Sequence, residues 1–130
     1  MKAIVFLSIF SFSAFASDFT KQIWSHNSDH YLFSLHSPSQ ILVSENCFND
    51  EVTLEQSKCD AIKALNQKHS LTVPASQFSG GKNPGAVACA VGLKMTIRIF
   101  TNSKNNENSF CEFNDGSMIS AINLQSLLKD

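Results

Sequence analysis

Apolar and polar side chains alternate most regularly between positions 94 and 100. Met95, Ile97 and Ile99 share one parity, and polar side chains occupy the positions between them. Because successive side chains of a strand point to opposite faces, this alternation predicts a strand with one apolar face. Residues 101–108 are polar and residues 109–113 are suited to a return strand. The segment therefore predicts a β-hairpin with a long polar tip.

Shorter strands are predicted on either side of the middle of the chain. Residues 31–36 and 40–44 are rich in strand formers, and the turn-forming cluster Ser37-Pro38-Ser39 separates them. The apolar segment 118–128 is suited to a last strand that runs into a short helix, although the pattern alone does not separate strand from helix there.

Two helices are predicted from their end signals. Thr53 and Gln56 have the spacing of a capping box, and an apolar stripe with helical spacing continues to about residue 67. Asn83 and Pro84 favour the start of a second helix, and Gly92 favours its end. The expected fold class is therefore α+β: one small domain in which short helices pack on an antiparallel sheet or hairpin.

The first sixteen residues have the composition of a signal peptide. Lys2 precedes an apolar stretch, and the small residues at 13–16 form a cleavage pattern that ends at Ala16. The apolar stretch is shorter than the roughly 20 residues that span a bilayer, so no integral membrane segment is expected. The sequence thus predicts export to the periplasm or the extracellular space, with residues 17–130 as one mature domain.

The charge of the chain is slightly negative and evenly spread. The formal net charge is −1 at pH 7, or −2 once Lys2 has left with the signal peptide, and there is no basic run. Nucleic acid is therefore an unsupported partner, and so is an anionic membrane surface.

Four cysteines in an exported chain indicate two disulfides. Three pairings are possible, and we favour Cys47–Cys59 with Cys89–Cys111 because each pair stays within one local supersecondary unit. Each closed loop would contribute roughly 3 kcal/mol in the chain-entropy model. The absence of a Cys-x-x-Cys pair from the sequence argues against a zinc site built from the four thiolates.

Part of the second half of the chain resembles a known family. Residues 83–89 read Asn-Pro-Gly-Ala-Val-Ala-Cys, Arg98 follows, and residues 110–117 read Phe-Cys-Glu-Phe-Asn-Asp-Gly-Ser. This order resembles the DUF333 family of small bacterial envelope domains, with Gly85 where the family usually has Ala, Gly92 alone in place of a Gly pair and Asn114 where Pro is common. The resemblance covers residues 83–130. It implies a bacterial source and the Cys89–Cys111 pairing, and it carries no chemistry.

Three histidines close in sequence are weak candidates for a metal site. His26, His30 and His36 could together bind a transition metal, and the first two would share a face of a helix. Their neighbours are Ser, Asn and Asp, which is typical of a polar strand edge rather than a preorganised site. We therefore expect neither a metal nor another cofactor.

The sequence lacks the patterns of common catalytic sites. There is no Gly-x-Ser-x-Gly, and four cysteines that pair fully leave no thiolate nucleophile. Glu112 and Asp115 could act as paired carboxylates, but Glu112 is expected to be a solvated strand residue. Arg98 is expected on the polar strand face, where it could pair with Glu112 across the hairpin or act in recognition.

The leading functional hypothesis is a non-enzymatic binding domain that acts outside the cytoplasm. Its partner would be an envelope or extracellular protein, or another envelope component, and the polar hairpin tip and an exposed strand face would make the contact. The alternatives are a small secreted hydrolase or metal-binding protein, and a secreted inhibitor or toxin. The oligomeric state is left open.

Overall fold

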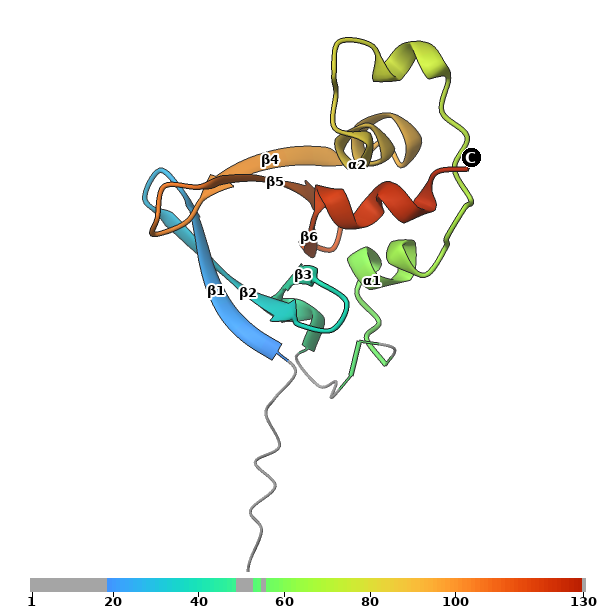
Figure 1. The fold of residues 1–130 in the computed structure, drawn as a ribbon. Coiled ribbons are helices and arrows are strands. Elements are labelled where there is room, and N and C mark those ends of the chain that lie inside the picture. The colour runs from blue at the N-terminus through green and yellow to red at the C-terminus, as the bar shows by residue number, and fades with distance from the viewer. Residues whose placement is uncertain (1–18, 49–52, 55, 130) are drawn as a thin grey trace, which may run out of the picture.

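The strands of the described chain close into an antiparallel barrel with the order β1-β2-β3-β6-β5-β4 (Figure 1). The computed structural model describes residues 19–48, 53–54 and 56–129. The strands are β1 (Phe19–His26), β2 (Asp29–His36), β3 (Ile41–Ser44), β4 (Thr96–Thr101), β5 (Glu107–Glu112) and β6 (Met118–Ser120).

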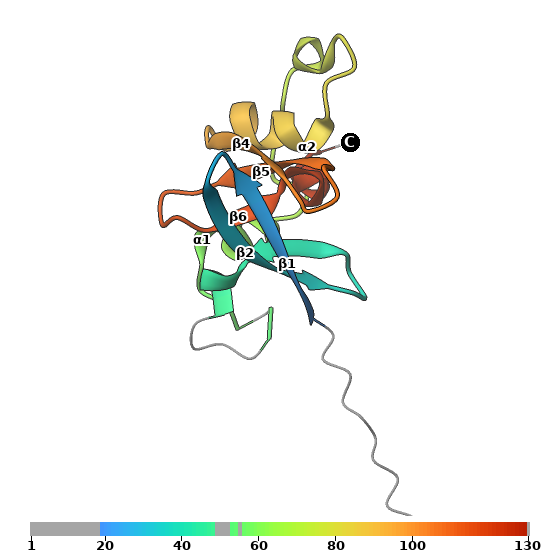
Figure 2. The same cartoon turned by 90° about the vertical axis from the view of Figure 1, so that its left-hand side faces the viewer.

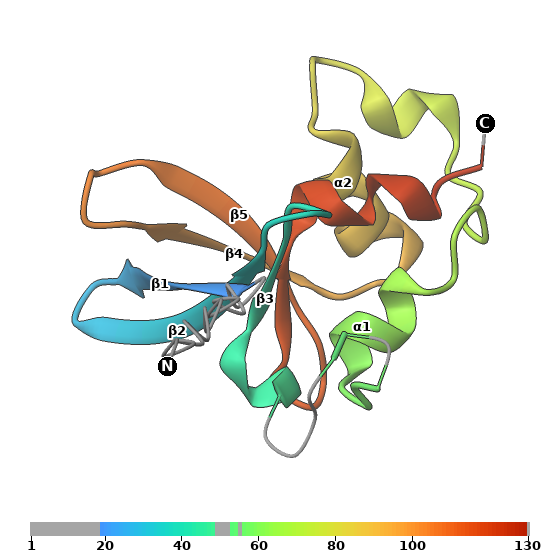
Figure 3. The ribbon, with the colours of Figure 1, turned by 60° about the horizontal axis from the view of Figure 1, so that its bottom comes forward.

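The helical segments are short and lie on one side of the barrel, away from the tips of the β1–β2 and β4–β5 hairpins (Figure 1). They are η1 (Glu45–Phe48), α1 (Asp60–Leu65), η2 (Ala75–Phe78), α2 (Pro84–Val87), η3 (Ala88–Gly92) and η4 (Ala121–Leu127). Figure 3 shows η4 running beside α2, while α1 lies across from them near β3.

The expected α+β fold class is wrong, because the described chain is a closed barrel and mostly β. The strand that the sequence pattern did not predict is β1, which pairs along its whole length with β2. Each face of β1 mixes polar and apolar side chains: Ile23 lies between Lys21 and Ser25, and Trp24 follows Gln22. The strand therefore lacks the clean alternation on which strand prediction depends.

The first predicted helix is also wrong in its extent. The structure has a bend at residue 53 and turns at residues 54 and 56, and α1 begins only at Asp60. The expected capping box of Thr53 and Gln56 therefore does not begin a helix. The residue before α1 is Cys59, whose disulfide holds this point of the chain, and the first turn of α1 is capped from elsewhere in the fold, as described below.

Other predicted elements are confirmed. The strand at 31–36 is part of β2, the strand at 40–44 corresponds to β3, and β4 and β5 form the predicted hairpin. The segment 118–128 is a strand followed by a 3₁₀ helix. Asn83 caps α2 by accepting hydrogen bonds from the N–H groups of Gly85 (2.8 Å) and Ala86 (3.4 Å). The helix then widens into the π-helical turn η3.

Two hydrophobic cores lie on opposite sides of the barrel wall. Tyr31, Leu35 and large buried side chains fill the interior, and the buried ones are Trp24, Phe33, Leu42, Phe100, Phe110 and Met118. The outer core lies between the wall and the helices. Val43, Cys111 and Ile119 contribute to it from the strands, and Ala61, Ile62, Leu65, Ala88, Cys89, Leu124 and Leu127 contribute from the helical side. The barrel and the helices therefore form one packed unit.

The barrel closes through a short contact between β1 and β4. Their registered pair is Ser25 with Thr101, close to the hairpin tips, which face the viewer in Figure 2. By contrast, β1 and β2 pair at eight positions. The two hairpins are therefore joined most closely near their tips.

Both predicted disulfides are confirmed. Cys47 pairs with Cys59, with Cα atoms 5.1 Å apart, and Cys89 pairs with Cys111, with Cα atoms 5.8 Å apart. The first joins η1, directly after β3, to the start of α1, and the second joins η3 to β5. Each disulfide thus fixes a helix against the barrel.

The proposed signal segment, residues 1–16, lies outside the described residues. None of the helices in the described part of the chain is long and apolar enough to cross a membrane.

Candidate functional site

The three histidines do not converge. His30 and His36 share a strand parity on β2, whereas the His26 ring faces Phe100 of the inner core, with ring centroids 6.4 Å apart. His36 hydrogen-bonds Ser39 through Nδ1 at 2.6 Å and packs against Phe19. Within the residues that the structure describes, no group of three His, Cys, Asp or Glu side chains could hold a metal ion.

A serine–histidine contact lies on the β1–β2 hairpin. Ser25 Oγ is 2.5 Å from His30 Nδ1, and the two residues are directly opposite in the strand register. His30 is exposed, and among the described residues no carboxylate hydrogen-bonds its ring. A nucleophilic serine needs a base that a third group orients. The contact is accounted for as a cross-strand pair.

Arg98 and Glu112 form the predicted cross-hairpin ion pair, with 3.5 Å between nitrogen and oxygen. The strand face on which Arg98 was expected also carries Phe100, an inner-core residue, and the Arg98 guanidinium lies 5.6 Å from its ring centroid. The two charged side chains are 35% and 31% exposed. The pair therefore lies at the margin of the inner core, whereas Ile99 on the other strand face is exposed.

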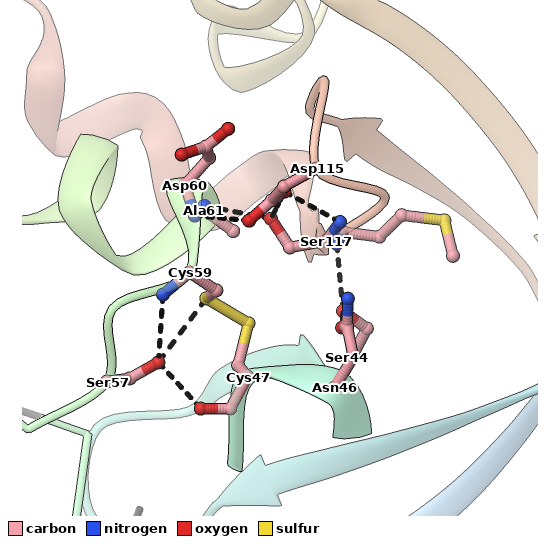
Figure 4. The surroundings of a disulfide bond; sticks show 10 residues. Ser44, Asn46, Cys47, Ser57, Cys59, Asp60, Ala61, Asp115 and Ser117 are labelled. Carbon is pink, nitrogen blue, oxygen red and sulfur yellow. Dashed lines mark hydrogen bonds between the residues drawn. A yellow bond between two sulfur atoms is a disulfide. The ribbon is translucent and has the colours of Figure 1, made fainter. Parts of the chain in front are cut away.

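The turn at Asp115 and Ser117 holds the beginning of α1 (Figure 4). The Asp60 N–H donates to Asp115 Oδ2 at 2.8 Å, and the Ala61 N–H donates to Ser117 Oγ at 3.0 Å. The Ser117 hydroxyl in turn donates to Asp115 Oδ1 at 2.5 Å. Cys59, the residue at the N-cap position, makes no side-chain cap. Two residues more than fifty positions away therefore satisfy donors that a helix start leaves unpaired.

Hydrogen bonds control the ionisation of Asp115. Burial alone would raise the pKa of this carboxyl group, but hydrogen bonds from the Ser117 side chain and from the N–H groups of Asp60 and Ser117 outweigh it. The pKa of Asp115 is therefore held below its ordinary value, and the carboxylate that caps α1 is the favoured form.

The Cys47–Cys59 disulfide is embedded in the same region (Figure 4). Cys47 is buried, and Ser57 Oγ donates to the Cys47 carbonyl at 2.7 Å. Next to it, Ser44 Oγ on β3 accepts from the Met118 N–H at 2.9 Å. The disulfide and this polar network fix α1 against the ends of β3 and β6.

The helix η4 is held to the β2–β3 turn by Asn123. Its Oδ1 accepts from the Leu42 N–H at 3.0 Å, and its Nδ2 donates to the Gln40 carbonyl at 3.0 Å. One side chain thus satisfies a donor and an acceptor on a distant segment, which sets the spacing between η4 and β3.

These constraints frame a groove of about 480 Å³, which we call the α1–η4 groove. It lies between α1, η4 and the β2–β3 turn, with Ile62 and Leu65 buried in its lining and Ile122 60% exposed. The apolar lining residues are Ile41, Leu54, Ile62, Leu65 and Ile122. The polar lining residues are His36, Ser39, Asn66, Lys68, Asn123 and Ser126.

A concave, mostly apolar surface with a few convergent polar groups is the usual form of a small-molecule site. The volume of the α1–η4 groove lies in the range of roughly 300–1,000 Å³ that such sites occupy. A second hollow, of about 280 Å³, lies beside α2 and includes Val91 and Ile97. The α1–η4 groove is the larger of these two and the richer in polar groups, so we take it as the candidate functional site.

Sequence reasoning singled out one residue of the groove, His36, and only as a weak candidate for a metal site that was not expected to form. The other lining residues come from segments between positions 39 and 126 that only the folded barrel brings together. No motif connects them, so the sequence carried no signal for the site. Comparison of the chain with models of known protein families, with curated proteins and with solved structures finds no match.

Proposed function

We propose that this protein is an exported, non-enzymatic binding domain that holds a component of the cell envelope or the extracellular space in the α1–η4 groove. The groove is the observation that carries the proposal. It combines an apolar lining with polar side chains, and a disulfide, a helix cap and the Asn123 contacts hold its walls. A site held in this way loses little entropy when it binds.

Export is supported by the cysteines and by the N-terminal segment. Both disulfides are compatible with an oxidising compartment. The composition of residues 1–16 favours a cleaved signal peptide, and the resemblance of residues 83–130 to envelope domains points the same way.

Intact mass measurement tests the export proposal. We expect the protein recovered from a bacterial host that expresses the full chain to begin at Ser17 and to contain no free thiol. Retention of residues 1–16 together with four free thiols would overturn the proposal.

Site-specific photo-cross-linking in the intact cell tests the groove. We would place a photoreactive amino acid at Ile122, in the groove, or at Ile99, on the strand face, as a matched control, because the two side chains are 60% and 55% exposed. We expect an adduct from position 122 and none from position 99. Adducts from position 99 alone, or from neither position, would contradict a binding function for the groove.

A further inference from the structure

We propose that the ligand of the α1–η4 groove is a single-chain aliphatic carboxylate of medium length, whose head contacts Lys68 and whose chain lies along Ile62, Leu65 and Ile122. This inference rests on the binding function proposed above and specifies its ligand.

The apolar lining selects a flexible chain rather than a ring. Its apolar members are isoleucine and leucine, and the described lining contains no phenylalanine, tyrosine or tryptophan. Aromatic ligands are commonly held by stacking on such rings. An alkyl chain is bound through the removal of apolar surface from water, for which isoleucine and leucine suffice. Ile122 is mostly exposed, so a bound alkyl chain would remove more apolar surface from water at Ile122 than at the buried Ile62 and Leu65.

The polar lining selects a negative head. Lys68 carries a positive charge, and the described lining residues include no Asp or Glu. The side-chain amide of Asn66 adds hydrogen-bond donors of the kind that a carboxylate accepts. The chain as a whole has a net negative charge, so the positive charge of the groove is a local feature and not a general property of the surface.

The volume of about 480 Å³ selects the size of the ligand. It lies in the lower half of the range for small-molecule sites, which suits one alkyl chain better than a lipid with two chains. The groove is also bordered by the His36–Ser39 hydrogen bond and by Asn123. The Asn123 side chain already hydrogen-bonds the backbone of Gln40 and Leu42. These polar groups therefore shape the edges of the groove and leave Lys68 as the charged contact.

Calorimetric titration with dodecanoate, below the concentration at which it forms micelles, tests the assignment. We expect the oxidised protein to bind dodecanoate, to bind the matched cation dodecyltrimethylammonium at least ten-fold more weakly, and to bind butyrate undetectably. Lys68→Gln should weaken dodecanoate binding about five-fold, as expected for one exposed charge. Lys63→Gln, which removes an exposed lysine of α1 outside the groove, is the matched control and should leave the affinity unchanged.

Ile122→Asn tests the chain contact independently, because Ile122 is exposed and its replacement does not threaten folding. We expect it to weaken dodecanoate at least three-fold. Equal binding of the cation and the carboxylate, or equal effects of Lys68→Gln and Lys63→Gln, would overturn the inference.

The cross-linking experiment separates this inference from the proposed function. If position 122 yields an adduct while dodecanoate does not bind, or if the adduct is a protein that a protease degrades, the ligand class is wrong and the binding function stands. If neither experiment detects an occupant, both proposals are overturned.

Discussion

Asp115 shows how one exposed side chain can determine where a helix begins. Its carboxylate accepts the Asp60 N–H, while Ser117 accepts the Ala61 N–H, so the donors at the start of α1 are satisfied from the β5–β6 turn. From the sequence, Asp115 was considered within the motif of residues 110–117 and as one half of a carboxylate pair with Glu112. The structure adds that the same turn is the cap of α1.

Asp115→Ala should therefore destabilise the fold. We expect a loss of about 1 kcal/mol in the free energy of unfolding, as for other helix caps, measured by urea denaturation at pH 7. Asn114→Ala changes an exposed neighbour on the same turn and should cost less than half as much. Equal losses for the two variants would argue against the capping role.

The lowered pKa of Asp115 also predicts a pH dependence. A carboxyl group whose pKa is lower in the folded than in the unfolded chain stabilises the fold above its unfolded pKa. That contribution is lost as the pH falls below about 4, through the folded pKa. We expect the unfolding free energy of Asp115→Asn to fall less steeply between pH 5 and pH 2 than that of the unchanged protein. Parallel curves would contradict this assignment.

At the scale of elements, Gly85 allows α2 to pack directly on the start of η4. A Cβ atom built on Gly85 would lie 1.9 Å from the backbone oxygen of Ala121. The absence of a side chain at this position is therefore what permits the close approach of α2 and η4.

Gly85→Ala should move α2 away from η4 and destabilise the fold by roughly 1–3 kcal/mol, the usual cost of overpacking. Gly92→Ala is the matched control, because its Cβ would meet the end of the Leu71 side chain, which can move. Thermal denaturation should show a larger fall in Tm for Gly85→Ala. A larger fall for Gly92→Ala would contradict the proposed packing.

The two disulfides should stabilise different segments of the fold. Replacing Cys47 and Cys59 together by serine should cost roughly 3 kcal/mol and speed amide hydrogen exchange in α1, while the β4–β5 hairpin stays protected. Replacing Cys89 and Cys111 should instead affect η3 and β5, which that disulfide joins. Equal acceleration of exchange throughout the chain in both variants would contradict this division.

At the scale of the whole molecule, the sequence predicted the parts whose signals are local. The β4–β5 hairpin has regular alternation, α2 has its own cap in Asn83, and each disulfide closes within one local unit. The barrel could not be predicted in the same way, because β1 carries mixed faces and because closure depends on the contact of Ser25 with Thr101. The start of α1 depends on Asp115, and the groove depends on residues that folding brings together.

The α1–η4 groove as the place of binding is the central claim, and amide hydrogen exchange of the oxidised protein tests it most directly. We would compare exchange before and after adding the soluble and lipid fractions of the envelope of a bacterial host. We predict that slower exchange is confined to α1, η4 and the β2–β3 turn. Slower exchange at the β4–β5 hairpin tip with none in α1 and η4, or no change anywhere, would contradict the claim.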